Sequence, residues 1–182
     1  MENAIGLIEL SSIAKGYQVT DKLVKAADSQ LVEAHSVCPG KFIVLITGLV
    51  GDVEKSIDAG MELADHSFVQ KLLIPNIHNQ LVPALRGLTP VEDLQALGIV
   101  ETFSAASTIT AADAAAKKAD VQLIDVRLAN ALGGKGYFTL TGTVEDVNSA
   151  VDAGCATIQD DGILIERVVI PRPDPAMKSA VL

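Results

Sequence analysis

The chain repeats itself, and the repeat limits the folds that it can adopt more than any other feature. The segment Ile5-Gly6-Leu7-Ile8-Glu9 returns 92 residues later as Leu97-Gly98-Ile99-Val100-Glu101. Further residues recur at the same spacing: Ser12, Asp21, Lys25, Asp28 and Gln30 meet Ser104, Asp113, Lys117, Asp120 and Gln122. A repeat of this length predicts two similar domains in one chain.

The spacing between the copies changes twice, in segments that are expected to be loops. After Cys38 it becomes 94, so that Gly40-Lys41 matches Gly134-Lys135. It later becomes 96, and Ile74-Pro75 then matches Ile170-Pro171. Because loops tolerate insertions better than strands or helices do, these two changes are what a duplicated fold predicts.

Each copy has the pattern strand, helix, strand, strand, helix, strand, followed by a short terminal helix. Apolar runs predict strands over Ala4–Leu10, Leu31–Val37, Phe42–Thr47, Leu72–Ile77, Val121–Leu128, Tyr137–Thr141 and Ile163–Ile170, and helical spacing predicts a helix over Val144–Ala156. We expect an α/β (α+β) protein with a four-stranded antiparallel sheet and helices in each domain. The first domain is predicted to span residues 1–88 and the second 95–182, with residues 89–94 as the linker.

Composition excludes several classes of protein. The net charge of −9 and the pI of about 4.7 argue against a nucleic-acid binder, which normally has a basic stripe. No apolar run reaches the roughly 20 residues of a membrane span. The start of the chain lacks the pattern of a signal peptide, so we expect a cytoplasmic protein. Two domains of about 90 residues lie near the lower size limit for a stable core, which favours oligomerisation.

Cys38 is the most informative single residue. Pro39 followed by Gly40 is the preferred central pair of a type II turn, because proline presets φ and glycine tolerates the positive φ that follows. Cys38 should therefore begin a tight turn at the end of a hairpin, with its side chain on the loop. Cysteine is usually buried, so a thiol at a loop tip is unusual.

Taken together, these residues resemble the bacterial microcompartment shell domain. The resemblance rests on the duplicated opening, on Asp-x-x-x-Lys in the first helix of each copy, on Asp-Ala-Gly in the second helix, and on the closing Ile170-Pro171-Arg172-Pro173. Two copies in one chain resemble the tandem, trimer-forming shell proteins. The Cys38-Pro39-Gly40-Lys41 loop most resembles the iron–sulfur-bearing tandem shell proteins of propanediol-utilisation compartments.

The resemblance implies a pseudohexameric homotrimer that is tiled into a shell with other shell proteins. Pro39, Gly40, Gly133 and Gly134 would then line the central pore. Lys25, Lys117 and Arg172 match the family's shell-edge contacts, and Asn76 stands in the first copy where Arg172 stands in the second.

A threefold axis would also change the number of cysteine ligands. One Cys38 cannot hold a metal site alone, but three chains bring three thiolates, which could bind three irons of one [4Fe–4S] cluster per trimer. Asn130 occupies the aligned position in the second copy, so only three sulfurs would meet. Zinc held by three thiolates and an unligated surface thiol remain alternatives.

Other candidate sites favour structural roles. Cys155 lies in a predicted helix and is expected to pack in the core, and none of His35, His66 and His78 has metal-ligand spacing. The Gly133-Gly134-Lys135-Gly136 segment lacks the spacing and the hydroxyl of a phosphate-binding loop. No nucleophile with an activating base accompanies the carboxylates, so we do not expect an enzyme.

The leading hypothesis is therefore a shell subunit of a bacterial microcompartment whose central cluster transfers electrons across the shell, with an encapsulated or cytosolic redox enzyme as partner. One alternative is a shell subunit with an open pore for small metabolites and no cluster. The other is a duplicated α/β regulatory protein unrelated to shells.

Overall fold

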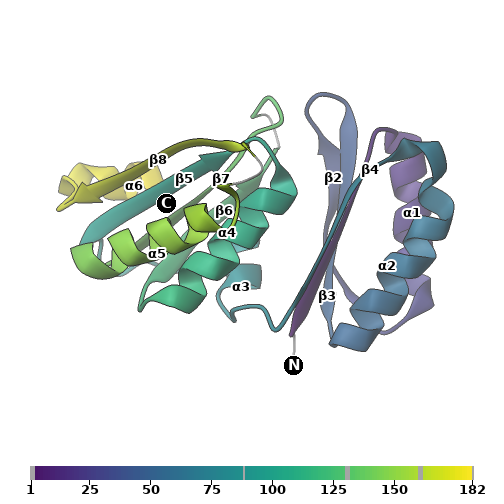
Figure 1. Cartoon of the computed structure of the whole chain (residues 1–182), viewed down its shortest axis with the longest axis horizontal. Helices are drawn as coiled ribbons and strands as arrows, with labels where there is room; N and C mark the ends of the chain where they lie inside the picture. Colours follow the sequence, from purple (N-terminus) through teal and green to yellow (C-terminus); the bar gives the residue numbers. More distant parts are fainter. Residues whose placement is uncertain (1–2, 88, 130–131, 160–161, 182) are drawn as a thin grey trace. The chain divides into compact units, whose positions relative to one another are not determined.

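The computed structural model describes residues 3–87, 89–129, 132–159 and 162–181. The chain divides into two compact units, Met1–Ile77 and His78–Leu182 (Figure 1). Each unit contains one four-stranded antiparallel sheet with helices, which confirms the predicted fold class and the duplication. The second unit begins at His78, before the linker proposed from the sequence, whose limits stay a prediction.

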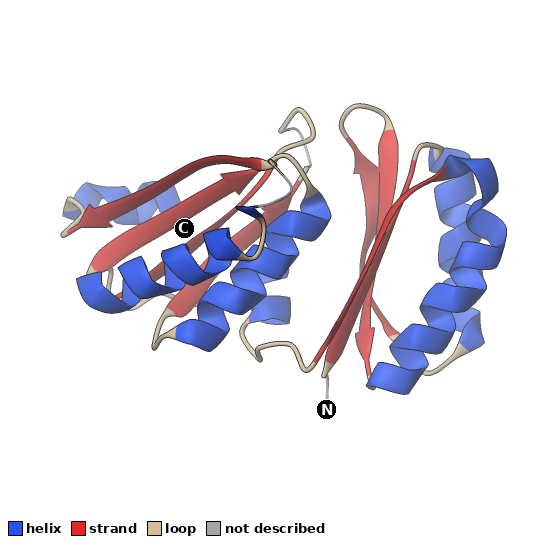
Figure 2. Cartoon of the chain, in the orientation of Figure 1, coloured by secondary structure: helices blue, strands red, loops and turns tan. Residues whose placement is uncertain are grey.

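The first unit has its sheet covered on one face by two helices (Figure 2). The sheet order is β2-β3-β1-β4. Along the chain the elements are β1 (Ala4–Leu10), α1 (Ile13–Ala26), β2 (Gln30–Val37), β3 (Lys41–Gly48), α2 (Val50–Ala64), η1 (Asp65–Ser67) and β4 (Phe68–Pro75).

The core of the first unit lies between this sheet and helices α1 and α2. Helix α1 begins at the cap Ser12, whose hydroxyl accepts a hydrogen bond from the backbone N–H of Lys15. Val19 and Leu23, one turn apart, face the sheet and are fully buried. Gly6 lets α2 approach β1 closely, because a Cβ there would lie 2.8 Å from the side chain of Ile57. Aliphatic residues and Phe42 fill the space between the sheet and the helices.

The second unit repeats the arrangement with sheet order β6-β7-β5-β8. Its elements are α3 (Leu81–Leu85), β5 (Ala96–Thr102), α4 (Ala105–Lys118), β6 (Gln122–Leu128), β7 (Gly136–Gly142), α5 (Val144–Ala156), β8 (Leu164–Pro171), η3 (Pro175–Met177) and α6 (Lys178–Val181). Helices α4 and α5 cover one face of this sheet (Figure 1). Ser104 caps α4 as Ser12 caps α1.

One close contact between helix and hairpin is built differently in the two copies. In the first copy, Gly16 of α1 lies against Phe42, whose ring would be 2.3 Å from a Cβ at position 16. In the second copy the small residue is on the strand, because a Cβ at Gly136 would lie 2.2 Å from the hydroxyl of Thr108. Thr108 and Gly136 are the counterparts of Gly16 and Phe42. The two copies therefore fill the same space with opposite choices of large and small residue.

The terminal helices of the two copies are α3 and α6. Within the second unit, α3 packs against β6 and α4. The backbone N–H of His78 donates to Asp113 Oδ1 of α4 (2.7 Å), and the Gln80 side chain bonds to the backbone of Val121 and Leu123 at the edge of β6. The counterpart α6 lies on the outer face of the second sheet, the face away from α4 and α5, where Met177 and Val181 join a cluster with Leu97 and Ile124.

Among the helices of the described ranges, none is both long enough and apolar enough to cross a membrane.

Candidate functional site

Cys38 lies at the tip of the hairpin between β2 and β3. The two strands are paired up to Val37 and Lys41, so the loop consists of only three residues, Cys38, Pro39 and Gly40. Pro39 and Gly40 are exposed, and Cys38 is a partly exposed free thiol. The structure therefore places Cys38 on the loop, as predicted, rather than in a core.

The turn itself differs from the predicted type II turn. The Cys38–Pro39 peptide bond is cis, and the N–H of Gly40 donates to the carbonyl of Val37 (3.0 Å). Cys38 and Pro39 are thus the central residues, as in a type VI turn, and the turn closes one residue earlier than expected. Gly40 follows with φ of 85°, and nothing lies within 4 Å of where its Cβ would be. The error arose because Pro-Gly favours two turn types, and only the isomer of the peptide bond distinguishes them.

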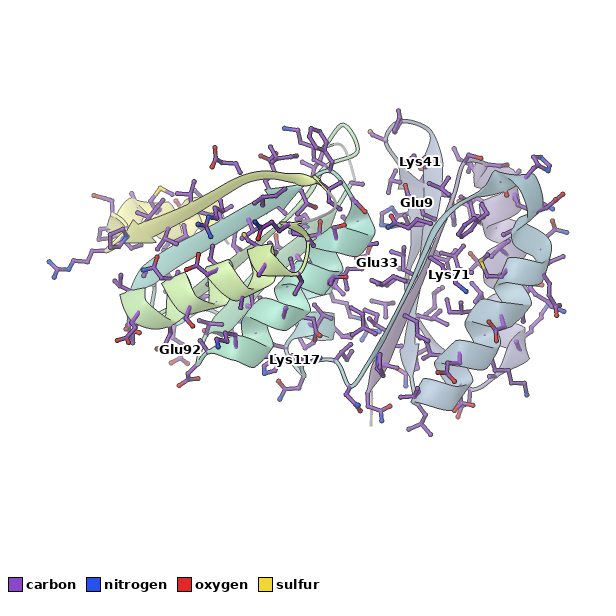
Figure 3. All side chains as sticks on the ribbon, in the orientation of Figure 1. Glu9, Glu33, Lys41, Lys71, Glu92 and Lys117 are labelled. Atoms are coloured by element: carbon purple, nitrogen blue, oxygen red, sulfur yellow. The ribbon has the colours of Figure 1, made fainter. Side chains whose placement is uncertain are left out.

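An ion pair supports the base of the same hairpin (Figure 3). Lys41 Nζ lies 2.8 Å from Glu9 Oε1, which joins β3 to β1. The second copy repeats the pair, with Lys135 Nζ 3.0 Å from Glu101 Oε1. The Glu9 side chain is 9% exposed and that of Glu101 is 34% exposed. The sequence shows that both Glu and Lys recur in the repeat, but it did not reveal that they pair.

A second acid–base pair lies on the edge strand of each sheet. In β2, His35 Nε2 lies 2.9 Å from Glu33 Oε2; in β6, Arg127 Nε lies 2.5 Å from Asp125 Oδ2. The hydrogen bond to Glu33 raises the pKa of His35, although burial opposes the shift. His35 is therefore an ion-pair residue of the strand that leads to Cys38.

The equivalent loop of the second copy is longer and richer in glycine. Between the end of β6 at Leu128 and the start of β7 at Gly136, the N–H of Ala129 donates to the carbonyl of Lys135 (2.9 Å). Gly133 and Gly134 adopt φ of 64° and 91°, a region that favours glycine. Asn130, which aligns with Cys38, lies outside the described residues. The pore-lining role predicted for Pro39, Gly40, Gly133 and Gly134 stays a prediction.

The residues predicted to form shell edges are also on the surface. Lys25 pairs with Asp21 (2.7 Å) and Lys117 with Asp113 (2.5 Å), each one helical turn apart. The Asp113 side chain is 6% exposed and also accepts a hydrogen bond from the His78 N–H, whereas that of Asp21 is 62% exposed. Their edge roles stay predictions.

The strand ends after β4 and β8 carry the remaining predicted edge position. Asn76 and Arg172 both adopt positive φ, 54° and 56°, and both are exposed. The two copies therefore have the same backbone conformation at this position but different side chains, Asn76 and Arg172.

No cluster of three or more His, Cys, Asp or Glu side chains in the described ranges is arranged to hold a metal ion. The second cysteine, Cys155, is buried in α5, as predicted for a core residue. Burial raises the pKa of the Cys155 thiol. Cys38 therefore belongs to no such cluster within the described part of one chain.

Comparison with known proteins identifies the fold. The family model of the BMC domain, the bacterial microcompartment domain, matches residues 4–77 and again residues 96–173. The chain belongs to the BMC family. The two matches coincide with the two sheets and their helices, so the BMC domain is the repeated unit.

Relatives of known type agree with this assignment. The bacterial microcompartment shell protein PduT of Citrobacter freundii is 44% identical over 177 residues, which cover 97% of this chain and 96% of PduT. The shell protein EutM of Salmonella typhimurium is 39% identical over 80 residues, covering 44% of this chain and 81% of EutM. The chain is a tandem BMC shell protein similar to PduT, and not an enzyme.

Solved structures show the same architecture. A microcompartment protein from Desulfitobacterium hafniense DCB superimposes with a TM-score of 0.95 at 45% identity, over 98% of this chain and 99% of that one. The fused permuted hexameric shell protein MSM0275 has a TM-score of 0.63 over 86% of this chain and 83% of its own, but at 24% identity it supports the fold alone. The hypothesis of a regulatory protein unrelated to shells is therefore wrong.

Proposed function

We propose that three copies of this BMC chain close into a pseudohexagonal plate and that the plate is a tile of a microcompartment shell. Two BMC domains per chain give six domains in three chains, which is the number that a hexagonal tile needs. The name of the relative PduT, a shell protein matched over nearly its whole length, supports the shell role. Head-to-tail contacts that close a ring are the usual route to a cyclic trimer.

Exposed apolar side chains on α1 support association between chains. Ile13, Tyr17 and Val24 lie on the outer side of this helix and are exposed, while Val19 and Leu23 face the core. A stripe of large apolar residues on the surface of a soluble domain marks a contact surface. We therefore place a chain-to-chain contact on the outer side of α1.

The plate would meet other shell proteins through Lys25, Lys117 and Arg172. All three side chains are on the surface, and both lysines are held by an aspartate one turn away. Asn76 replaces the arginine on the first copy, at the same backbone conformation. Alternate edges of the plate would therefore differ in charge, and we expect them to prefer different neighbours.

At the centre of the plate we propose one [4Fe–4S] cluster, held by Cys38 of the three chains. The observation that carries this proposal is a free, partly exposed thiol on a three-residue loop that projects beyond paired strands. Thiolate is the usual ligand of iron–sulfur clusters. Three chains supply three thiolates, and the fourth iron takes a ligand from elsewhere.

The surroundings of Cys38 fit such a group. The space around Gly40 is open and Pro39 is exposed, so the loop leaves room for a cluster beside the thiol. The Lys41–Glu9 pair ties the base of the loop to the central strand and is electrically balanced. The chain's part is thus to hold Cys38 on a short, braced loop. A bound cluster supplies one-electron transfer, so we propose electron passage across the shell to an encapsulated or cytosolic redox enzyme.

The alternative within the family is a tile whose central pore stays open for small metabolites, with Cys38 unligated. The same exposed thiol and open loop are compatible with it, as they are with zinc bound by three thiolates. The three possibilities differ in metal and sulfide content.

The decisive experiment is anaerobic purification followed by visible absorption, iron, zinc and acid-labile sulfide analysis, and EPR after reduction. We expect a brown protein with about four irons and four sulfides per three chains. A colourless protein that stays free of iron after anaerobic reconstitution contradicts the cluster. Zinc without sulfide supports the three-thiolate zinc site instead.

Two cysteine variants make a matched pair. Cys38→Ser should abolish colour and iron while the trimer persists in size-exclusion chromatography with light scattering. Cys155→Ala, which removes the buried cysteine, should keep both. If Cys155→Ala lost the colour and Cys38→Ser kept it, the ligand would be Cys155 and the proposal for Cys38 would be wrong.

A further inference from the structure

Two buried polar atoms on the outer face of the second sheet have no partner. They are Thr139 Oγ1 and Asp125 Oδ1, and neither has a hydrogen-bond partner among the described residues. Thr139 is only 7% exposed, and the other carboxylate oxygen of Asp125 is taken by Arg127. The two residues are paired across strands β6 and β7. A buried polar group without a partner has lost its hydrogen bonds to water, so an arrangement that pairs both atoms is expected in the functional state.

Both residues line one small cavity of about 170 Å³. Its remaining walls are mostly apolar and come from the sheet and from α6: Leu97, Ile99, Tyr137, Met177, Ala180 and Val181. A group with an apolar body and a hydroxyl fits this site, because the hydroxyl can donate to the carboxylate and accept from the threonine. A tyrosine side chain has this combination.

The chain carries an exposed tyrosine, Tyr17, on helix α1. Tyr17 of α1 is 64% exposed, and its ring lies beside that of Phe42, with centroids 4.9 Å apart and the ring planes tilted by 55°. Its counterpart in the second copy is Ile109, which is fully buried. A hydroxyl therefore occurs at this helical position only in the first copy, just as Thr139 in the second copy replaces the apolar Leu45 of the first.

The terminal helices indicate how α1 and this cavity meet. Helix α3, which ends the first copy, docks on α4 and β6, and Asp113 receives the N–H of His78. Helix α6 is the counterpart of α3, and α1 with β2 are the counterparts of α4 with β6. The docking position on α1 is open, since the side chain of Asp21 is 62% exposed where that of Asp113 is 6% exposed. A second copy of the chain can offer this position to α6.

We infer that Tyr17 of one chain completes the Asp125–Thr139 site of the next chain in the ring. In this contact α1 of one chain docks on α6 and on the outer face of the neighbour's second sheet. The Tyr17 hydroxyl donates to Asp125 Oδ1 and accepts from Thr139 Oγ1, so both unpaired atoms are satisfied at once. The inference rests on the proposed trimer and names the residues that fasten it.

The first test measures trimer dissociation on dilution, by native mass spectrometry and light scattering. Tyr17→Phe keeps the ring and removes the hydroxyl. If each of three contacts weakens about tenfold, the overall constant changes about a thousandfold and the midpoint concentration rises about thirtyfold. The control Thr20→Val removes another hydroxyl of α1, which bonds to Gly16 within the helix, and should leave the midpoint unchanged.

Thr139→Val tests the inference through the direction in which the stability of the trimer changes. If Tyr17 bonds to Thr139 in the trimer, this change weakens the trimer, and adding it to Tyr17→Phe has little further effect. If the Thr139 hydroxyl stays unpaired in the trimer, valine removes a buried unpaired group and the trimer becomes as stable or more stable. The second outcome, or a Tyr17→Phe trimer that dissociates like the wild type, overturns the inference.

Photo-crosslinking tests the contact directly. p-Benzoylphenylalanine at position 17 should give a covalent dimer on irradiation, with the link mapped by mass spectrometry to residues 122–128, 136–142 or 175–181. The same group at Glu62, an exposed position on α2, should give none of these links. Links from position 17 to other segments overturn the inference. A wild-type chain that is monomeric at every concentration contradicts the proposed trimer itself, which is a separate result.

Discussion

Helix α1 and its counterpart α4 have the same place in the two BMC domains but different surroundings. Helix α1 buries Gly16, Val19 and Leu23 on one side and exposes large residues on the other. Helix α4 is rich in alanine and buries ten of its fourteen residues, including the polar Ser107, Thr108 and Asp113. Duplication keeps the inner face of the helix fixed by the core, whereas the outer face is free to acquire a separate contact in each copy.

The largest change in the free energy of unfolding is expected at the contact between helix α1 and strand β3, where Gly16 meets Phe42. Gly16→Thr places the residue of the second copy into the first, where a Cβ would lie 2.3 Å from the ring of Phe42. Because the ring cannot move without disturbing the core, we expect a loss of about 3 kcal/mol in the free energy of unfolding. Urea unfolding followed by circular dichroism measures it.

The matched test rebuilds the first copy's packing in the second. Gly136→Phe alone clashes with Thr108 and should destabilise the second domain by a similar amount. Adding Thr108→Gly should recover part of the loss, since the backbone carbonyl of Arg127 still lies 3.0 Å from a Cβ at position 136. A double variant no more stable than Gly136→Phe alone would show that the two contacts are not equivalent.

An intermediate effect is expected at the hairpin ion pairs. Glu9→Gln removes a carboxylate that is 9% exposed and leaves Lys41 without its counter-charge, so we expect a loss of about 1–2 kcal/mol. Glu101→Gln changes a pair whose carboxylate is 34% exposed, and the expected loss is below about 1 kcal/mol. Urea unfolding at neutral pH compares the two, and equal losses would contradict the argument from burial.

The smallest effect concerns pH. The pKa of His35 is raised in the folded state above its ordinary value of 6.5, chiefly by the hydrogen bond to Glu33. The stabilisation is therefore fully present below about pH 6.5 and is lost as pH rises through the folded-state pKa. Because the pair is partly exposed, we expect a few tenths of a kcal/mol.

The control converts the first copy to the charge pattern of the second. His35→Arg copies Arg127, whose charge does not titrate in this range, and should remove this part of the pH dependence. Unfolding free energies between pH 5.5 and 8.5 and an NMR titration of His35 measure it. A His35 titration below the ordinary value would contradict the expected direction.

Most of the fold could be predicted from the sequence because two copies gave two readings of each element. The strands Ala4–Leu10 and Ala96–Thr102 are apolar runs, and each ends just before the serine that caps the next helix, Ser12 or Ser104. These signals are local in the sequence. The turn at Cys38 was predicted wrongly, because Pro-Gly does not reveal the isomer of the preceding peptide bond. The attachment of α3 to β6 also escaped, since it depends on Gln80 reaching strand residues more than 40 positions away.

The candidate site was predictable only where it depends on residue type and loop position. Cys38 stood out because a cysteine before Pro-Gly is unusual, and its exposure agrees. The ion pairs Lys41–Glu9 and Lys135–Glu101 join adjacent strands that are far apart in sequence, so only the sheet register brings them together. The unpaired atoms of Asp125 and Thr139 become visible only when every neighbour is known.

The exchange of Gly16 and Phe42 for Thr108 and Gly136 has a consequence for inheritance. Gene conversion between tandem copies would replace part of one copy with the sequence of the other. If only the first helix of the first copy were replaced, the threonine of the second copy would meet Phe42 and clash. If only that of the second copy were replaced, the glycine of the first copy would face Gly136 and leave a void. We expect such hybrids to be less stable than the parent chain. The packing would therefore disfavour an exchange of this helix alone between the two copies.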